Sequence, residues 1–346
     1  MDPNSQVLSW QLSVALDLAR QCEQVVVLTN KVSYFEKPEN MEVFLFPKLL
    51  FRAPFRFFGG KWLVNFFVFF LCIRFGIKAC FIHMNMEWGY RLAPAFRLLG
   101  IPVVLWYAHG TITKELERAH RHVDRVVTST PEGFRLKSNK VSIIGQGIDT
   151  EQFSFIKLST EAKNIITVGR ISQRKRIDAM IDVMEELIKI DPHTPFRLII
   201  IGAPITPQDD IYYHKLLERA SRSEIGDRVD FVGHISTNNI PRFYRHTFLH
   251  LNLSATGSMD KTVLEAIAVG CPVLTSNEAF HEILSSIPEF IIHDQSPESI
   301  AQQIHSIYIR GSEIDRVRIR SIVDGKHDLK TFGQRILQEI QALIAS

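Results

Sequence analysis

The residues best placed to do chemistry lie in one stretch, 251–271, where an apolar run gives way to a small polar loop and then to a helix. The loop reads Gly257, Ser258, Met259, Asp260, Lys261 and Thr262, and Glu265 follows one helical turn later. Outward-pointing N–H groups and the dipole at the start of a helix attract anions, phosphates above all. Lys261 adds positive charge there, and Glu265 offers a carboxylate to hydroxyl groups. The stretch therefore predicts a site for a nucleotide-sugar, unless the loop and helix only pack on a sheet.

A second basic group follows an apolar run at 164–168, in the segment GRISQRKR. The guanidinium of Arg170 can fork onto phosphate oxygens, and Lys175 adds a point charge. Together with the helix entry at Lys261, these two cations would neutralise a diphosphate. The alternative is a solvated basic loop, because Arg174 and Arg176 stand in the same segment.

Two histidines end apolar runs, His83 in ACFIH and His109 in PVVLWYAH. Ligands of open parallel sheets bind beyond the carboxyl ends of the strands. Gly110 follows His109 and leaves room for a ligand to approach the backbone, so His109 is the candidate catalytic residue.

The elements that must position these residues alternate between helices and short, β-branched strands, which indicates an α/β fold with parallel sheets covered on both faces. Strands are predicted at 24–29, 41–46, 79–83, 102–109, 125–129, 164–168, 196–202, 228–232, 248–253 and 272–275, and helices at 7–22, 177–190 and 329–345. The chain opens on a helix, so the first strand of its first doubly wound sheet is expected to be missing.

The length of 346 residues favours two domains over one. We predict a Rossmann-like domain over 1–155, a second over 156–325, and a final helix at 326–346 that returns to the first.

Composition excludes some functions. The net charge of +3 is too small to indicate nucleic-acid binding. The four cysteines, Cys22, Cys72, Cys80 and Cys271, are scattered and lack metal-ligand spacing, which predicts reduced thiols and a cytoplasmic protein. The N-terminus lacks the pattern of a secretory signal.

The segment 48–78 is rich in Phe and Leu and carries basic residues around its apolar block, namely Arg52, Arg56, Lys61, Arg74 and Lys78. The block 62–73 is far shorter than the roughly 20 residues that span a bilayer. It is either a buried helix of the first domain or an interfacial helix that contacts anionic lipid.

Taken together, the motifs resemble glycosyltransferase family 4, whose enzymes have the GT-B architecture of two Rossmann-like domains facing a cleft. The resemblance covers about 8–345, and its motifs are VGR with Lys175, FVGHI at 231–235, VLEA at 263–266, GCPV at 270–273, WYAH at 106–109 and GQGID at 145–149. It implies that Arg170 and Lys175 bind the donor's diphosphate, that Glu265 binds the ribose hydroxyls, and that His109 lies near the transferred sugar. The sequence departs from the family at Gly257, where the first of two glutamates spaced by seven residues normally stands.

The resemblance implies a retaining transfer of a sugar from a nucleotide diphosphate donor to a lipid-linked or glycan acceptor, at the inner face of a membrane. No DxD pair stands in a suitable loop, so no metal cofactor is expected. Two alternatives stay open: a sugar-nucleotide epimerase, and a non-catalytic subunit of a membrane assembly, which the change at Gly257 and the 48–78 segment favour. An NAD-dependent dehydrogenase is disfavoured, because no GxGxxG follows a strand.

Overall fold

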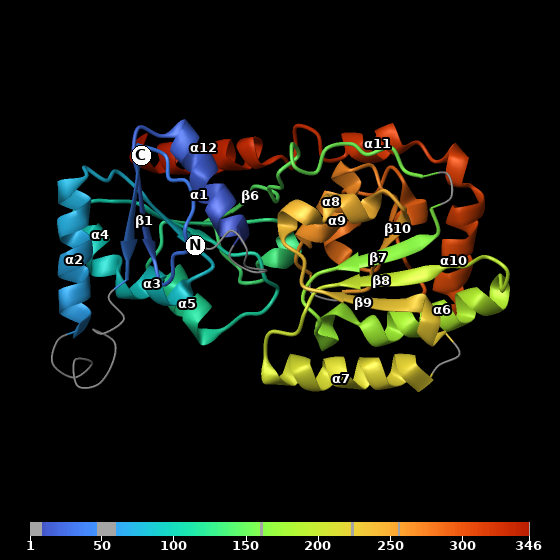
Figure 1. Ribbon diagram of the computed structural model, residues 1–346. Coiled ribbons are helices and arrows are strands. Elements are labelled where there is room, and N and C mark those ends of the chain that lie inside the picture. The colour runs from blue at the N-terminus through green and yellow to red at the C-terminus, as the bar shows by residue number, and fades with distance from the viewer. Residues whose placement is uncertain (1–8, 47–59, 160–161, 223–224, 255–256, 346) are drawn as a thin grey trace. The chain divides into compact units, whose positions relative to one another are not determined.

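The computed structural model of the chain describes residues 9–46, 60–159, 162–222, 225–254 and 257–345. By internal compactness the chain divides into two units (Figure 1). Unit 1 comprises Met1–Gly147 together with Leu329–Ser346, and unit 2 comprises Ile148–Asp328. The final helix therefore belongs with the N-terminal part of the chain.

The described part of unit 1 contains six parallel strands in two separate sheets. Strands β3 (Cys80–His83), β4 (Val103–Trp106), β5 (Arg125–Thr128) and β6 (Val141–Ile143) form a sheet in that order. Strands β1 (Val25–Thr29) and β2 (Met41–Leu45) pair only with each other among the described strands. The predicted strands are therefore present and parallel, but they are divided between two sheets.

Strand β4 shows why unit 1 has a helix layer on each face of its sheet. Alternate side chains of a strand point to opposite faces, and all four side chains of β4 are buried. Val103 and Leu105 pack into one apolar cluster, while Val104 and Trp106 pack into another that includes Phe332. The helices around the sheet are α1 (Ser9–Gln21), α2 (Gly60–Arg74), α3 (Met86–Arg91), α4 (Ala93–Leu98), α5 (Lys114–His120) and α12 (Leu329–Ala345). Helices α1 and α12 contact each other (Figure 1).

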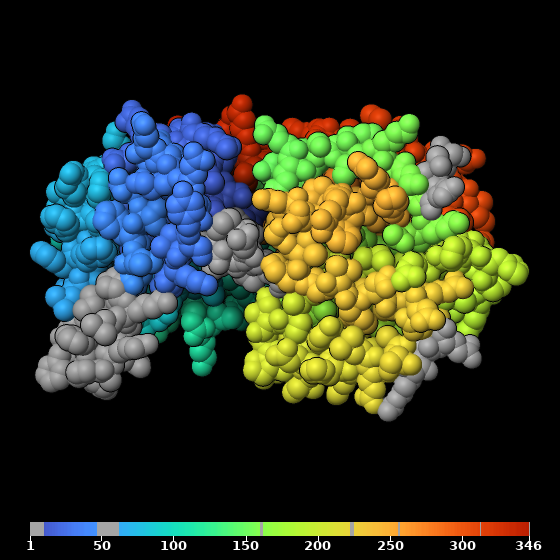
Figure 2. All heavy atoms as spheres, viewed as in Figure 1, coloured from blue at the N-terminus to red at the C-terminus, as the bar shows by residue number. Residues whose placement is uncertain are grey.

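Helix α2 is buried on one face only. Val64, Val68 and Leu71 lie in the core of the unit. The opposite face exposes apolar side chains, which are Trp62, Leu63, Phe66, Phe70 and Ile73. Figure 2 shows this helix, in light blue, on the surface of unit 1. Helix α2 therefore has one face buried in unit 1, as the first interpretation of 48–78 expects, and one face exposed, as the second expects. The part at 48–59, with Arg52 and Arg56, lies outside the described residues.

Asn65 interrupts the apolar run of α2 because its side chain fastens the helix to its neighbours. Its amide donates to the backbone oxygen of Arg91 at 2.9 Å, and its oxygen accepts from the backbone of Ala95 at 3.2 Å. Within the described ranges, no helix is long and apolar enough to cross a membrane.

The described residues of unit 2 form one doubly wound sheet of five parallel strands, covered by helices, in the order β11-β10-β7-β8-β9. The strands are β7 (Asn164–Val168), β8 (Arg197–Ile201), β9 (Val229–Gly233), β10 (Thr247–Asn252) and β11 (Val273–Thr275). The helices are α6 (Ile177–Ile190), α7 (Pro207–Arg222), α8 (Pro241–Tyr244), α9 (Lys261–Ala268), α10 (Pro297–Ile309) and α11 (Arg316–Ser321). All six residues of β10 are buried, as befits a strand covered on both faces.

Two arginines of unit 2 bind the last carbonyl groups of α9. Arg316, on α11, donates to the backbone oxygens of Gly270 at 2.7 Å and Val269 at 3.2 Å. Arg320, also on α11, donates to the backbone oxygen of Ala268. The C-terminal end of α9 therefore carries two guanidinium groups on carbonyls that the helix itself leaves unpaired.

The four cysteines are all free, as predicted. The cytoplasmic location inferred from them stays a prediction.

Candidate functional site

The carboxyl edge of the unit 2 sheet is formed by glycines at the ends of three neighbouring strands. Gly169, Gly202 and Gly233 end or follow β7, β8 and β9, with φ angles of 138°, 151° and 81°. A Cβ atom on Gly202 would lie 1.8 Å from the backbone oxygen of Gly169. Only glycine fits at position 202, so the ends of β7 and β8 pack backbone against backbone. Because no side chains project there, a ligand can approach the backbone closely.

Lys175 lies against this edge. It belongs to a short 3-10 turn, Gln173–Lys175, and a Cβ atom on Gly169 would lie 3.3 Å from its Cε. Its side chain is only 17% exposed, and its Nζ lies 3.0 Å from Oδ2 of Asp260. The carboxylate of Asp260, at the start of α9, therefore holds the ammonium of Lys175 against the glycines at the strand ends.

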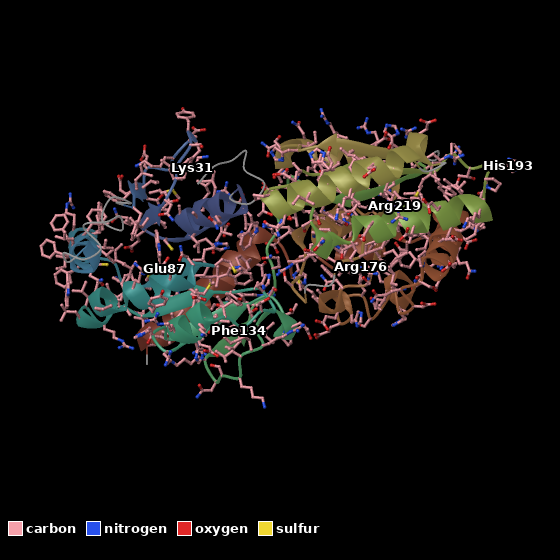
Figure 3. The ribbon with its side chains drawn as sticks, turned by 90° about the horizontal axis from the view of Figure 1, so that it is seen from below. Lys31, Glu87, Phe134, Arg176, His193 and Arg219 are labelled. Atoms are coloured by element: carbon pink, nitrogen blue, oxygen red, sulfur yellow. The ribbon has the colours of Figure 1, made fainter. Side chains whose placement is uncertain are left out.

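The other basic residues of the segment, Arg170, Arg174 and Arg176, differ from Lys175 in their exposure and in their partners. Arg170 is 43% exposed, and its Nε lies 3.7 Å from a carboxylate oxygen of Asp209 in the first turn of α7. Arg176, labelled in Figure 3, has a left-handed φ of 51° and donates to Gln295. Arg174 is exposed. The segment therefore holds one mostly buried cation, Lys175, which a uniformly solvated basic loop would not show.

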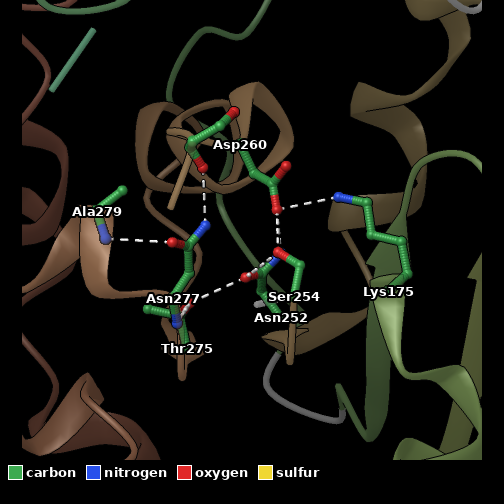
Figure 4. Close-up of polar contacts among 8 residues, drawn as sticks. Lys175, Asn252, Ser254, Asp260, Thr275, Asn277 and Ala279 are labelled. Carbon is green, nitrogen blue, oxygen red and sulfur yellow. Dashed lines mark hydrogen bonds and ion pairs between the residues drawn. The ribbon is translucent and has the colours of Figure 1, made fainter. Parts of the chain in front are cut away.

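Asp260 is the centre of a buried polar network (Figure 4). Its Oδ2 accepts from Asn252 at 2.9 Å, from the hydroxyl of Ser254, and from Lys175. Asn252 is oriented in turn by Thr275, whose hydroxyl donates to its side-chain oxygen at 3.0 Å. Burial acts to raise the pKa of Asp260, but Lys175 and the hydrogen bonds from Ser254 and Asn252 hold it below its ordinary value. Asp260 is therefore a carboxylate at neutral pH.

This network leaves the start of α9 without a side-chain cap. Asp260 occupies the N-cap position, yet its side chain makes no hydrogen bond to the first turn of the helix. The hydroxyl oxygen of Thr262, in that turn, is buried without a hydrogen-bond partner among the described residues. A buried hydroxyl in this condition costs about 1–3 kcal/mol. The helix entry thus keeps both its dipole and an unsatisfied polar atom.

Lys261 and Glu265 lie one turn apart on α9, where their charges interact. Burial raises the pKa of the Glu265 carboxyl above its ordinary value, against the opposing effect of Lys261. Burial likewise lowers the pKa of the Lys261 ammonium, against Glu265 and Asp260. Because burial disfavours the charged forms of Lys261 and Glu265, a ligand that pairs with those charged forms would stabilise them.

The loop before α9 contains the departure from the family motif. Gly257 has a left-handed φ of 62°, a conformation that would cost another residue about 1–2 kcal/mol. The side chain of Met259 is buried in the core. Ser258 is held through its backbone oxygen, which accepts from Asn277 at 2.9 Å. The backbone at Gly257 therefore disfavours the glutamate that the motif normally has; Ala255 and Thr256 lie outside the described residues.

His109 belongs to unit 1 and follows β4. Its backbone N–H donates to the oxygen of Gly133 at 2.8 Å, and its Nδ1 accepts from the N–H of Thr111 at 3.2 Å. An accepting Nδ1 places the proton of a neutral imidazole on Nε2. The loop thus fixes both the position and the tautomer of His109.

The structure brings together Lys175, Asp260 and the start of α9, and it leaves Arg170 beside them on the same strand-end loop. Sequence reasoning missed three residues of the network: Asn252 and Thr275, which bond to each other, and Asn277, which bonds to the backbone of Ser258. Their signal was a polar residue at or just after the carboxyl end of a buried strand. Across the described residues, no three His, Cys, Asp or Glu side chains lie close enough to hold a metal ion.

Part of the chain is similar to known proteins. Residues 162–309, within unit 2, match the family model of Glycosyl transferases group 1. The mannosylfructose-phosphate synthase of Agrobacterium fabrum is 25% identical over 174 residues, which cover 45% of this chain and 38% of that protein. The lipopolysaccharide core biosynthesis mannosyltransferase LpsB of Rhizobium meliloti is 28% identical over 176 residues, 48% of this chain and 49% of LpsB. The matches thus span less than half of these curated relatives.

Among solved structures, HepE from Anabaena in complex with UDP aligns with a TM-score of 0.72 at 15% identity, covering 92% of this chain and 100% of HepE. The fold is therefore GT-B, as predicted, and the part of the chain at 162–309 is similar to group 1 glycosyltransferases. Assignment to family 4 stays a prediction.

Proposed function

We propose that the protein is a nucleotide-sugar-dependent glycosyltransferase of family 4 that transfers a hexose to a lipid-linked or glycan acceptor. The observation that carries the proposal is the ammonium of Lys175, fixed between the glycine edge of the sheet and the uncapped start of α9. A mostly buried cation next to helix N–H groups suits a diphosphate.

In this proposal the donor's diphosphate lies against Lys175, Arg170 and the first turn of α9. Arg170 is half-exposed and only loosely paired with Asp209, so it is available to fork onto phosphate oxygens. Thr262 gains the hydrogen bond that its hydroxyl lacks. Glu265, three residues further along the helix, receives the ribose hydroxyls. HepE, whose fold resembles that of this chain, was solved in complex with UDP, and this supports a nucleotide as the ligand of the proposed site.

The chemistry needs the negative charge that develops on the departing diphosphate to be stabilised. Lys175, Arg170 and the dipole of α9 supply positive charge for this, so we propose that no divalent cation is required. Following the family resemblance, the reaction retains the anomeric configuration, and His109, with its tautomer fixed by Thr111, contacts the sugar or acceptor. Activity that vanishes in excess chelator and returns with manganese would contradict the metal-independent mechanism.

The experiment on the donor site compares two variants of the same segment. Arg170→Ala combined with Lys175→Ala should abolish the rise in unfolding temperature that nucleoside diphosphates give the wild type, because ligand binding stabilises the fold by mass action. Arg174→Ala is the matched control, since Arg174 is an exposed cation of the same loop. Equal stabilisation of the wild type and the double variant by UDP, GDP and ADP would overturn the proposed site.

Turnover separates the rival functions. Release of nucleoside diphosphate only in the presence of an acceptor indicates transfer, whereas conversion of the donor sugar without release indicates epimerisation. Binding without turnover on any acceptor would indicate a non-catalytic subunit.

The exposed face of α2 supports the membrane part of the proposal. Trp62, Phe66, Phe70 and Ile73 recur at helical spacing on that face, between 56% and 78% exposed. Arg74, the last residue of α2, and Lys78, four residues beyond it, are both exposed. Such a face lies in the interfacial region of a bilayer, where basic residues attract anionic lipid. We propose that α2 makes peripheral contact with the cytoplasmic face of a membrane, close to a lipid-linked acceptor.

Sedimentation with lipid vesicles tests this contact. Phe66→Ser combined with Phe70→Ser should release the protein from vesicles that contain anionic lipid. Ile211→Ser is the control, since Ile211 is 60% exposed on α7 of unit 2. If the double variant sediments as the wild type does, α2 is not the contact surface.

A further inference from the structure

Cationic side chains gather where three neighbouring strands of unit 1 begin. Strands β4, β5 and β6 are parallel and lie side by side, so their starting ends share one edge of the sheet. Arg97 lies in the last turn of α4, ahead of β4, and Arg118 and Arg121 lie at the end of α5, ahead of β5. Lys140 directly precedes β6. These four residues, Arg97, Arg118, Arg121 and Lys140, are called the basic edge below.

His122 lies in the middle of the basic edge. The ammonium of Lys140 donates to the backbone oxygens of Val123 at 3.0 Å and His120 at 3.5 Å, which are on either side of His122 in the chain. Burial, followed by the charges of all four residues of the basic edge, lowers the pKa of the His122 imidazole. The four cations are therefore close enough to act on one side chain.

Within the described part of the chain, no ion pair joins the basic edge to a carboxylate. Arg125, at the start of β5, is different, because it pairs with Glu339 at 3.3 Å. Asp124 lies next to the edge in the chain, but its Oδ2 accepts from the backbone N–H of Val103 at 2.7 Å. The positive charges of the basic edge are therefore not neutralised by acidic neighbours.

The ends of the helices account for only part of this charge. Cations near the end of a helix offset its negative pole, which equals roughly half a charge for each helix. Helices α4 and α5 end here, so their poles supply about one negative charge together, and Asp124 supplies another. The four cations therefore leave an excess of about two positive charges.

The basic edge also holds polar atoms that a ligand can use. Nδ1 of His122 is buried and makes no hydrogen bond to the described residues, although such atoms are bonded in most native proteins. Arg97, Arg118 and Arg121 are exposed, and the guanidinium of Arg118 is held 4.8 Å from the ring centre of Tyr90. The edge thus combines accessible guanidinium groups with an unsatisfied imidazole.

We propose that the basic edge is a binding site for a phosphate group that carries two negative charges. A phosphate monoester has a charge of about −1.5 to −2 at pH 7, which matches the excess, whereas a carboxylate supplies only one. The guanidinium groups fork onto the phosphate oxygens, and Nδ1 of His122 gains its missing partner. The phosphate belongs either to a molecule free in solution or to the headgroup of a lipid.

This site is separate from the rim that carries the candidate catalytic histidine. Strand β4 has four residues and is about 13 Å long, with the basic edge at its start and His109 after its end. A phosphate at the basic edge therefore holds or regulates the protein and takes no part in the reaction. The inference does not rest on the proposed donor site of unit 2.

Titration calorimetry with sodium pyrophosphate, in a buffer free of phosphate, tests the site. The background is Arg170→Ala combined with Lys175→Ala, because the proposed donor site would bind the same anion. In this background, adding Arg118→Ala and Arg121→Ala should weaken binding at least about tenfold, since charge-assisted hydrogen bonds are lost.

The matched control removes the same amount of charge elsewhere. Lys114 and Lys215 are exposed, the first at the opposite end of α5 and the second on α7 of unit 2. Replacing both with Ala in the same background should leave the affinity for pyrophosphate unchanged. If malonate, a dicarboxylate, binds the background as tightly as pyrophosphate does, a site for phosphate is contradicted.

Sedimentation with vesicles identifies the source of the phosphate. Phosphatidic acid, mixed into neutral phosphatidylcholine, presents a phosphate monoester, and the background is Phe66→Ser combined with Phe70→Ser, which removes the proposed contact through α2. Release by Arg118→Ala with Arg121→Ala, but not by the lysine control, supports a lipid headgroup. Loss of pyrophosphate binding alone supports a phosphate free in solution. If this arginine variant behaves like the lysine control in both assays, the proposal is overturned.

Discussion

The ion pair between Lys175 and Asp260 makes the sharpest prediction for the donor site. Their charged atoms lie 3.0 Å apart, and each side chain is only 17% exposed. At an effective dielectric constant near 20, this separation corresponds to a gross attraction of roughly 5 kcal/mol. Asp260→Asn keeps an oxygen for Asn252 and Ser254 but leaves the ammonium of Lys175 without its carboxylate. Removing one partner of a buried pair costs about 3–5 kcal/mol, so we expect a loss of ~3 kcal/mol in the free energy of unfolding.

A bound diphosphate should recover most of this loss. In the wild type the diphosphate and Asp260 compete for Lys175, whereas in Asp260→Asn the phosphate charge takes the place of the missing carboxylate. The nucleoside diphosphate that binds the wild type should therefore stabilise the variant by ~1–3 kcal/mol more, a gain in affinity of roughly 5- to 150-fold at a saturating concentration.

The assay is urea unfolding at pH 7.5, with and without the nucleoside diphosphate, together with titration calorimetry. Asp230→Asn is the matched control, because Asp230 pairs with Arg197 at an exposed site where an ion pair contributes only about 0–1 kcal/mol. The reasoning is refuted if the ligand stabilises the wild type and Asp260→Asn equally, or if the variant binds more weakly.

Three further predictions concern other parts of unit 2. Gly202→Ala should lower the free energy of unfolding by at least about 2 kcal/mol and weaken donor binding, because its methyl group would overlap the backbone oxygen of Gly169. Gly311→Ala is the control and should leave the free energy of unfolding unchanged, because a methyl group there meets open space. The midpoints of urea unfolding measure both changes. Thr262→Val should stabilise the free protein by ~1 kcal/mol and weaken nucleotide binding about fivefold, and calorimetry that finds binding unchanged would remove Thr262 from the site. Burial lowers the pKa of His250 from 6.5 to about 3. Below pH 6.5 the histidine is therefore protonated in the unfolded chain but neutral in the folded one. The free energy of unfolding should fall by about 1.4 kcal/mol for each pH unit below that value. His250→Phe should lose this slope, about 2 kcal/mol between pH 6.5 and 5, when unfolding is followed across that range.

Much of the fold could be predicted because local pattern and tertiary structure agree. Helix α6 has the predicted bounds, 177–190, since its apolar residues recur at helical spacing and Asp191 ends them. Each predicted strand is present within two residues at its start, because β-branched runs bounded by polar residues leave little choice. The split between β1 and β3 was not visible, since pairing depends on what lies between strands and not on their own residues.

The site was predictable only in part. The basic residues and the start of α9 were chosen from charge and helix dipole, which are local properties. Lys175 and Asp260 are 85 positions apart in the chain and lie in the loops that follow β7 and β10. They meet because these two strands are neighbours in the sheet. The exposure of one face of α2 likewise depends on which neighbours Asn65 fastens it to. Neither follows from sequence spacing.

The arginines at the end of α9 have a consequence for how donor affinity can change. Their two positive charges compensate the negative pole of α9, the helix whose positive pole would receive the phosphate in the proposed donor site. The helix has eight residues and is about 12 Å long, so these charges act within range of the ligand without touching it. If the proposed donor site is correct, substitutions in α11 should therefore change nucleotide affinity in small electrostatic steps without altering any residue proposed to contact the nucleotide.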